Sequence, residues 1–74
     1  MQYRNVSSTS IAEVGYDKDH AILAVRFRNG AEYRYFLVPE RVFQGFLQAP
    51  SAGAYFHAHV RNAGFHHEQT RAAT

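Results

Sequence analysis

The pair Asn29-Gly30 most constrains the fold of this chain, because alternating apolar residues lie on both sides of it in ILAVRFRNGAEYRYFLV, residues 22–38. An Asn-Gly pair between two such runs is a strong local signal for a β-hairpin. The stretch therefore predicts two antiparallel strands joined by a tight loop.

The length of this loop sets the register of the hairpin. A two-residue loop would place Val25 opposite Arg34 and mix charged with apolar side chains on both faces. A three-residue loop over residues 28–30, with Gly30 in the left-handed conformation, places Val25 opposite Tyr33 instead. A slip of one residue exchanges the two faces of a strand, so the alternation predicts the three-residue loop. The apolar face then carries Leu23, Val25, Phe27, Tyr33 and Tyr35, and the other face carries Arg26, Glu32 and Arg34.

Tyr33 and Tyr35 admit two interpretations. In the predicted register they point inward, where their hydroxyls can reach a buried partner or the rim of the core. If they instead faced solvent, they would offer rings on which bases stack, as the aromatic residues of RNA-recognition sheets do. The alternation favours the interior position.

The segments before the hairpin are a polar lead-in over residues 1–10 and a predicted strand over residues 11–17, in which Gly15 marks a bulge or a close approach of another segment. After the hairpin, Val38-Pro39-Glu40 is typical of a helix start, and Ala49-Pro50 ends that helix. Gly45 inside it costs about 1 kcal/mol relative to alanine, so it indicates close packing.

A second helix is predicted from Ala52 to about Arg61, with Ser51 as its N-cap. Residues 66–74 lack periodicity and are predicted to be a mobile tail. The fold class is therefore α+β, a three-stranded antiparallel meander sheet followed by two short helices packed on one face. We expect a single domain over residues 1–74, with its core over about 6–61.

The composition excludes some kinds of site and favours some partners over others. The chain has no cysteine, which excludes disulfides and thiolate metal sites. No apolar run approaches the length of a membrane span or a signal region, so we expect a soluble, cytoplasmic protein with no membrane partner. Net charge is +2 and seven of the eight basic residues are arginine, which favours an anionic partner weakly.

Taken together, these segments resemble the KTSC domain, which is named for its occurrence at the C-terminus of some lysyl-tRNA synthetases. The resemblance covers roughly Val6 to Arg61. It is carried by Tyr33, Tyr35, Val38, Pro39 and the stretch APSAGAYF, which includes Tyr55 and Phe56. It implies a small stand-alone bacterial protein, and the synthetase context suggests RNA binding. We interpret the motif residues themselves as structural.

One departure from the family pattern concerns the start of the second helix. The family usually has a sequence like S-K-G-K-Y-F there, whereas this chain has Ala52 and Ala54 in place of the two lysines. If those lysines contact phosphate in relatives, this chain lacks that contact.

Six residues form the candidate nucleic-acid interface. Three share the charged sheet face or its turn, and three lie at or after the start of the second helix: Arg26, Arg28, Arg34, Ser51, Gly53 and Arg61. Arginines position phosphates, and free N–H groups at a helix start attract anions. The alternatives are a solvated face of ordinary ion pairs and an ordinary capped turn.

The histidines do not predict a metal site. His57 and His59 are two apart and so lie on different faces of a helix, while His66 and His67 are adjacent in the predicted tail. Asp17 and Asp19 are typical of a turn. We expect no metal, no cofactor and no enzymatic activity.

Two functional hypotheses follow. The first is a small accessory domain that binds RNA, for example a tRNA-like molecule, or another nucleic acid. The second is a protein-interaction or self-association module, either a monomer or a weak homodimer, because the outer edges of the first and third predicted strands are open to pairing.

Overall fold

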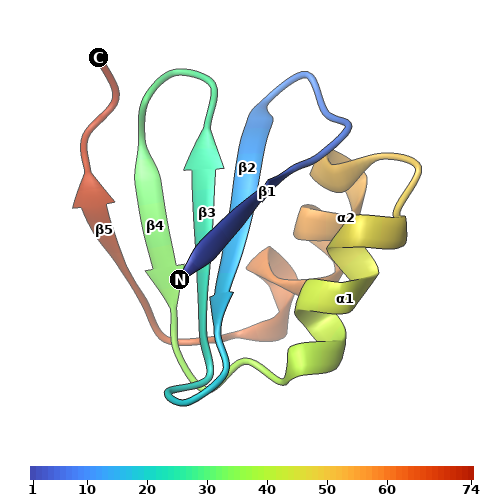
Figure 1. Ribbon diagram of the computed structural model, residues 1–74. Coiled ribbons are helices and arrows are strands. Elements are labelled where there is room, and N and C mark those ends of the chain that lie inside the picture. Colours follow the sequence, from blue (N-terminus) through green and yellow to red (C-terminus); the bar gives the residue numbers. More distant parts are fainter.

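The computed structural model describes every residue from Met1 to Thr74 and shows one antiparallel sheet with two helices on one of its faces (Figure 1). The sheet has five strands, which lie side by side in chain order. The elements in sequence are β1 (Gln2–Asn5), β2 (Ile11–Asp17), β3 (Ile22–Phe27), β4 (Glu32–Tyr35), α1 (Glu40–Gln48), α2 (Ala52–His59), the 3-10 helix η1 (Arg61–Ala63) and β5 (His67–Arg71).

The predicted hairpin register is confirmed in β3 and β4. Leu23 lies opposite Tyr35, and Val25 lies opposite Tyr33. The Phe27 N–H donates to the Ala31 carbonyl at 2.8 Å, which closes a three-residue loop over residues 28–30. Gly30 has a φ of 95°, the left-handed conformation that this loop requires of its last residue.

The α+β class is confirmed, but the prediction of three strands is wrong, because β1 and β5 extend the sheet at both edges. Apolar alternation cannot reveal either strand, since β5 is exposed at all five positions and β1 at three of its four. The edges of β2 and β4, which the homodimer hypothesis requires to be open, are therefore paired within the chain.

Strand β5 occupies most of the segment for which the sequence predicts a mobile tail. It pairs antiparallel with β4, with His67 opposite Tyr35 and Gln69 opposite Tyr33. Beyond the strand, the Thr74 N–H donates to the Asn29 carbonyl at 2.8 Å. The C-terminal segment thus runs beside β4 and reaches the loop between β3 and β4.

Strand β1 runs obliquely across the sheet face opposite the helices (Figure 1). Tyr3 pairs with Gly15 of β2, and a Cβ atom on Gly15 would lie 3.1 Å from Cδ2 of Tyr3 and 3.1 Å from Cγ of Met1. The close approach that Gly15 indicates in the sequence is therefore made by the first residues of the chain.

The core lies between the sheet and the two helices, as predicted. Its fully buried side chains come from β2, β3, the segment after β4 and both helical segments: Ile11, Val14, Leu23, Val25, Val38, Phe46 and Val60. Helix α1 follows Pro39, which is its N-cap residue rather than its first residue. Helix α2 follows Ser51, whose side chain accepts from the Ala54 N–H at 3.3 Å, so the predicted cap is confirmed.

Candidate functional site

The arginine face of the sheet is covered and neutralised by neighbouring residues. The Arg26 Nε donates to Glu32 Oε1 at 2.8 Å, and its Nη1 donates to Glu13 Oε1 at 3.3 Å. The Tyr3 ring lies over the guanidinium, with Cζ of Arg26 at 3.5 Å from the ring centroid. The Tyr3 hydroxyl also donates to Glu32 Oε2 at 2.9 Å. The Arg26 guanidinium thus contacts two carboxylates and one aromatic ring.

Glu32 is the centre of this arrangement and is 6% exposed. Burial raises the pKa of its carboxyl, but the hydrogen bonds from Arg26 and Tyr3 outweigh that effect and leave the pKa below its ordinary value. The Arg34 Nε lies 3.9 Å from Glu32 Oε2, and Arg28 donates its Nε to the Ser8 carbonyl at 3.0 Å. Two arginines and two glutamates therefore balance on this face, as the ion-pair alternative predicts.

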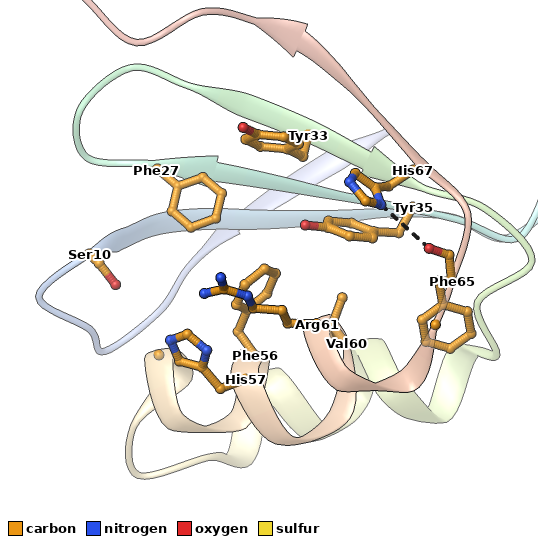
Figure 2. A pocket seen from close by; sticks show the side chains of 12 residues that line it. Ser10, Phe27, Tyr33, Tyr35, Phe56, His57, Val60, Arg61, Phe65 and His67 are labelled. Carbon is orange, nitrogen blue, oxygen red and sulfur yellow. Dashed lines mark hydrogen bonds between the residues drawn. The ribbon is translucent and has the colours of Figure 1, made fainter.

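The opposite face of the hairpin forms one wall of a pocket of about 620 Å³, which we name the tyrosine pocket (Figure 2). The sheet and the β1–β2 loop contribute Ser10, Phe27, Tyr33, Tyr35 and His67, and the helical segments contribute Gly53, Phe56, His57, Val60, Arg61, Gly64 and Phe65. No carboxylate lines it.

Aromatic rings make up the sheet wall of the tyrosine pocket. Tyr33 and Tyr35 have centroids 6.5 Å apart and planes inclined by 30°. His67 of β5 lies 5.2 Å from the Tyr35 centroid at 31°, so it extends the same layer of rings. Phe56 of α2 meets Tyr35 edge to face at 5.9 Å. The two tyrosines are thus both core residues and pocket residues, which combines the two interpretations that the sequence allows.

The Tyr35 hydroxyl opens onto the pocket, and the one side-chain polar atom that is both fully buried and without a hydrogen-bond partner is instead the Nε of Arg34. Tyr35 is only 6% exposed, yet its hydroxyl makes no hydrogen bond with any protein atom. Buried tyrosine hydroxyls usually find a partner. Burial raises the Tyr35 pKa and Tyr33 adds to this, while the positive charge of Arg61 acts in the opposite direction. The Arg61 guanidinium lies on the same side of the pocket as this hydroxyl (Figure 2).

The start of α2 brings one free backbone donor to the same pocket. The Ala52 N–H donates to the Ser7 carbonyl at 2.9 Å, and the Ala54 N–H donates to Ser51 Oγ at 3.3 Å. The Gly53 N–H between them has no acceptor in the protein. Because residue 53 is glycine, no side chain covers this amide, and the Ser8 Oγ would lie 3.3 Å from a Cβ placed there.

The predicted interface residues are therefore separated into two groups. Gly53 and Arg61 lie together in the tyrosine pocket, and Ser51 supports them as a helix cap. Arg26 and Arg34 lie on the opposite face of the sheet, and Arg28 lies near the β1–β2 loop.

The sequence gives no role to His57 and His67 in a binding pocket. His67 reaches the pocket because β5 pairs with β4, and no periodicity signals that strand. His57 lies next to Phe56 on α2, so its position follows once Phe56 is placed inward.

Two of the motif residues, Val38 and Tyr55, contribute to packing. Val38 is fully buried, and Tyr55 donates its hydroxyl to the Val42 carbonyl at 2.9 Å, which ties α2 to α1. Ala52 is also fully buried, whereas Ala54 is exposed. At position 52, therefore, this chain places a small core side chain where the family pattern has lysine.

Three comparisons place the chain among known proteins. The family model described as the KTSC domain matches residues 7–65. A protein of Stutzerimonas stutzeri (strain A1501), named an uncharacterized protein, is 45% identical over 51 residues, which are 69% of this chain and 72% of that relative. A protein of Tsukamurella paurometabola is 43% identical over 56 residues, which are 76% and 84% of the two chains.

A solved structure agrees with this assignment. The crystal structure of a KTSC domain protein from Yersinia pestis has a TM-score of 0.81 and 39% identity, covering 92% of this chain and 94% of that chain. Neither helix of the present structure is long and apolar enough to cross a membrane. The sequence motifs, the family model and the shared fold agree, and the chain belongs to the KTSC domain family.

Proposed function

We propose that this protein is a non-catalytic accessory domain that binds single-stranded RNA, and that the tyrosine pocket is where it does so. The observation that carries the proposal is the meeting of stacked rings, the Arg61 guanidinium and the free Gly53 amide in one pocket. The proposal keeps the RNA hypothesis but moves its centre from the arginine face to the pocket.

The rings would bind a base by stacking. Proteins that recognise single-stranded RNA stack unpaired bases on aromatic side chains, and each stacked base contributes about 1–3 kcal/mol. Tyr33 is half-buried and His67 is exposed, so a base can reach the outer part of the ring layer. Tyr35 lies deeper and would contact the sugar or phosphate rather than the face of a base.

The phosphate would be bound at the start of α2. Arg61 supplies the positive charge, and Gly53 supplies a backbone N–H that the helix leaves free. Because Arg26 and Arg34 are already paired with carboxylates, few cations take part. We therefore expect a plot of log Kd against log salt concentration to have a slope of only about 0.7 to 1.4. This slope corresponds to the neutralisation of one or two phosphates.

The test is to titrate the isotopically labelled protein with tRNA and with a uridine hexamer at low salt. We expect the amides of Gly53, Tyr35 and Arg61 to shift, while that of Lys18, on the β2–β3 turn, stays in place. The RNA should be recovered at full length, because the proposal includes no cleavage. If neither RNA moves the pocket amides, the proposal is wrong.

A second candidate is self-association through the outer edge of β5. All five residues of this strand are exposed, and it has a partner on one side only. Sedimentation velocity over a concentration series distinguishes the two candidates, because a protein that remains monomeric at high concentration does not pair through this edge.

A further inference from the structure

We infer that the tyrosine pocket recognises a phosphate monoester on a nucleotide, either a free nucleoside monophosphate or the phosphorylated end of an RNA strand. The inference rests on the proposed function and adds the chemical form of the ligand. Its basis is the number and placement of unused hydrogen-bond donors in the pocket.

The donors gather on one side of the pocket and come from three parts of the chain. Figure 2 shows the hydroxyl ends of Tyr33 and Tyr35, the Arg61 guanidinium and the His57 ring facing this region, with the Ser10 hydroxyl at its border. The Gly53 N–H adds a backbone donor from the start of α2. Neither tyrosine hydroxyl has a protein partner.

The Tyr35 phenol belongs to the least exposed residue among the unused donors. The side chain is 6% exposed, and what exposure it keeps is toward the pocket, so a ligand in the pocket can accept from its hydroxyl. Arg61 lines the same pocket, with its guanidinium on the side of this hydroxyl (Figure 2). An anion that accepts from both groups would use the Tyr35 hydroxyl and balance the charge of Arg61.

A monoester fits this set of donors better than an internal phosphodiester does. A phosphate monoester carries about −1.5 to −2 charges at pH 7 and has three strong acceptor oxygens. A diester has one charge and two free oxygens, so it would leave several of these donors unused. No carboxylate lines the pocket to oppose the second negative charge.

The surroundings also favour an end over the middle of a strand. A pocket of about 620 Å³ is in the size range of small-ligand sites and suits one nucleotide. A strand that continued on both sides would need cations for its neighbouring phosphates. Two arginines of the sheet, Arg26 and Arg34, are paired with Glu32 on its other face. The base would lie over Tyr33 and His67, on the side away from Ser10.

The experiment compares ligands that differ only in the phosphate, with affinity measured by calorimetry and by the shifts of pocket amides. The pairs are adenosine monophosphate against adenosine, and an adenosine hexamer with a 5′- or 3′-phosphate against the same hexamer with hydroxyl ends. We expect the phosphorylated member of at least one pair to bind tenfold or more tightly. Inorganic phosphate alone should bind weakly, since it lacks the stacked base.

Two variants connect the effect to the pocket. Tyr35→Phe retains the ring and removes the unpaired hydroxyl, so the preference for phosphate should fall at least threefold while the fold, checked by circular dichroism, is kept. Arg61→Gln, at an exposed position, should abolish the preference. Arg28→Gln removes an equal charge outside the pocket and is the control, for which the preference should be unchanged.

The outcomes separate this inference from the proposed function. If neither pair shows a preference for its phosphorylated member and the hexamers shift the pocket amides, RNA binding stands and the monoester inference is wrong. If only adenosine monophosphate binds, the monoester inference stands, a free nucleotide is its source, and the RNA proposal fails. If no ligand binds, both fail.

Discussion

The Tyr55 ring occupies the space beside Gly45 that any larger side chain would need. A Cβ atom on Gly45 would lie 2.8 Å from Cε2 of Tyr55, and closer still to the hydroxyl end of the ring. The ring is held there by its hydrogen bond to the Val42 carbonyl at 2.9 Å and by an edge-to-face contact with Phe46 at 4.7 Å. Gly45 therefore lets α1 and α2 pack closely, as its place in a helix indicates.

Replacing Gly45 by alanine should destabilise the protein, although alanine favours a helix by about 1 kcal/mol. The added methyl group would displace Tyr55 and break its hydrogen bond, and overpacking of this kind costs about 1–3 kcal/mol. We expect a lower free energy of unfolding for Gly45→Ala, measured by urea denaturation followed by circular dichroism.

The control is the same substitution in a Tyr55→Ala background. There the space is empty, so Gly45→Ala should be neutral or stabilising, and the two substitutions should be strongly non-additive. Equal losses in both backgrounds would show that the ring is not the reason for glycine at this position.

The pH dependence of stability should depend on Glu32. Its pKa is lower in the folded chain than its ordinary value, so the folded state binds fewer protons than the unfolded state. The resulting stabilisation is fully present above the ordinary pKa of 4.5 and is lost as pH falls through the lower, folded value. We expect the free energy of unfolding to fall over this acidic range, and Glu32→Gln to flatten that part of the curve.

At neutral pH the same variant should lose about 1–3 kcal/mol, because Arg26 and Tyr3 lose a charged partner in a mostly buried setting. Glu13→Gln is the matched control, since Glu13 also binds Arg26 but is about one-third exposed. A larger loss for Glu13→Gln than for Glu32→Gln would contradict the central position given to Glu32.

The parts of the fold that the sequence predicts are those in which apolar residues mark one face. The β3–β4 register follows from the single arrangement that keeps Val25 and Tyr33 together on one side. Strands β1 and β5 leave no such pattern, because their outward side chains meet solvent. Their backbone pairing with β2 and β4 leaves no side-chain periodicity in the sequence.

The candidate site could also be predicted only in part from the sequence, for a different reason. The sequence places Arg26 correctly beside Glu32, but it does not show that Tyr3 covers the pair, since this contact depends on β1. Likewise, the Gly53 amide is free only because the Ser7 carbonyl and the Ser51 hydroxyl bind its neighbours. Such features depend on contacts between distant segments, so they become visible only in three dimensions.

Tyr3 should stabilise β1 through two separable contacts. Tyr3→Phe removes the hydrogen bond to Glu32 and keeps the ring over Arg26, so we expect a loss of about 1.5–3 kcal/mol at most, the range for a hydrogen bond to a charged group. Tyr3→Ala also removes the cation–π contact, which adds about 0.5–1 kcal/mol at a partly exposed site. Urea denaturation of both variants checks the order, and a Phe variant no more stable than the Ala variant would contradict a role for the ring.

Removal of β5 should change both stability and the tyrosine pocket. Deleting residues 67–74 removes the pairing with β4, the His67 ring and the hydrogen bond from Thr74 to Asn29. A freely mobile tail could be deleted without effect, whereas a paired strand contributes about 1 kcal/mol per hydrogen bond. We therefore expect a clearly lower free energy of unfolding in urea denaturation, faster hydrogen exchange at Tyr33 and Tyr35, and weaker RNA binding.

The point substitution His67→Ala keeps the strand and removes only the ring, so it should weaken RNA binding with little loss of stability. An unchanged unfolding curve for the deletion would instead support the mobile tail that the sequence predicts.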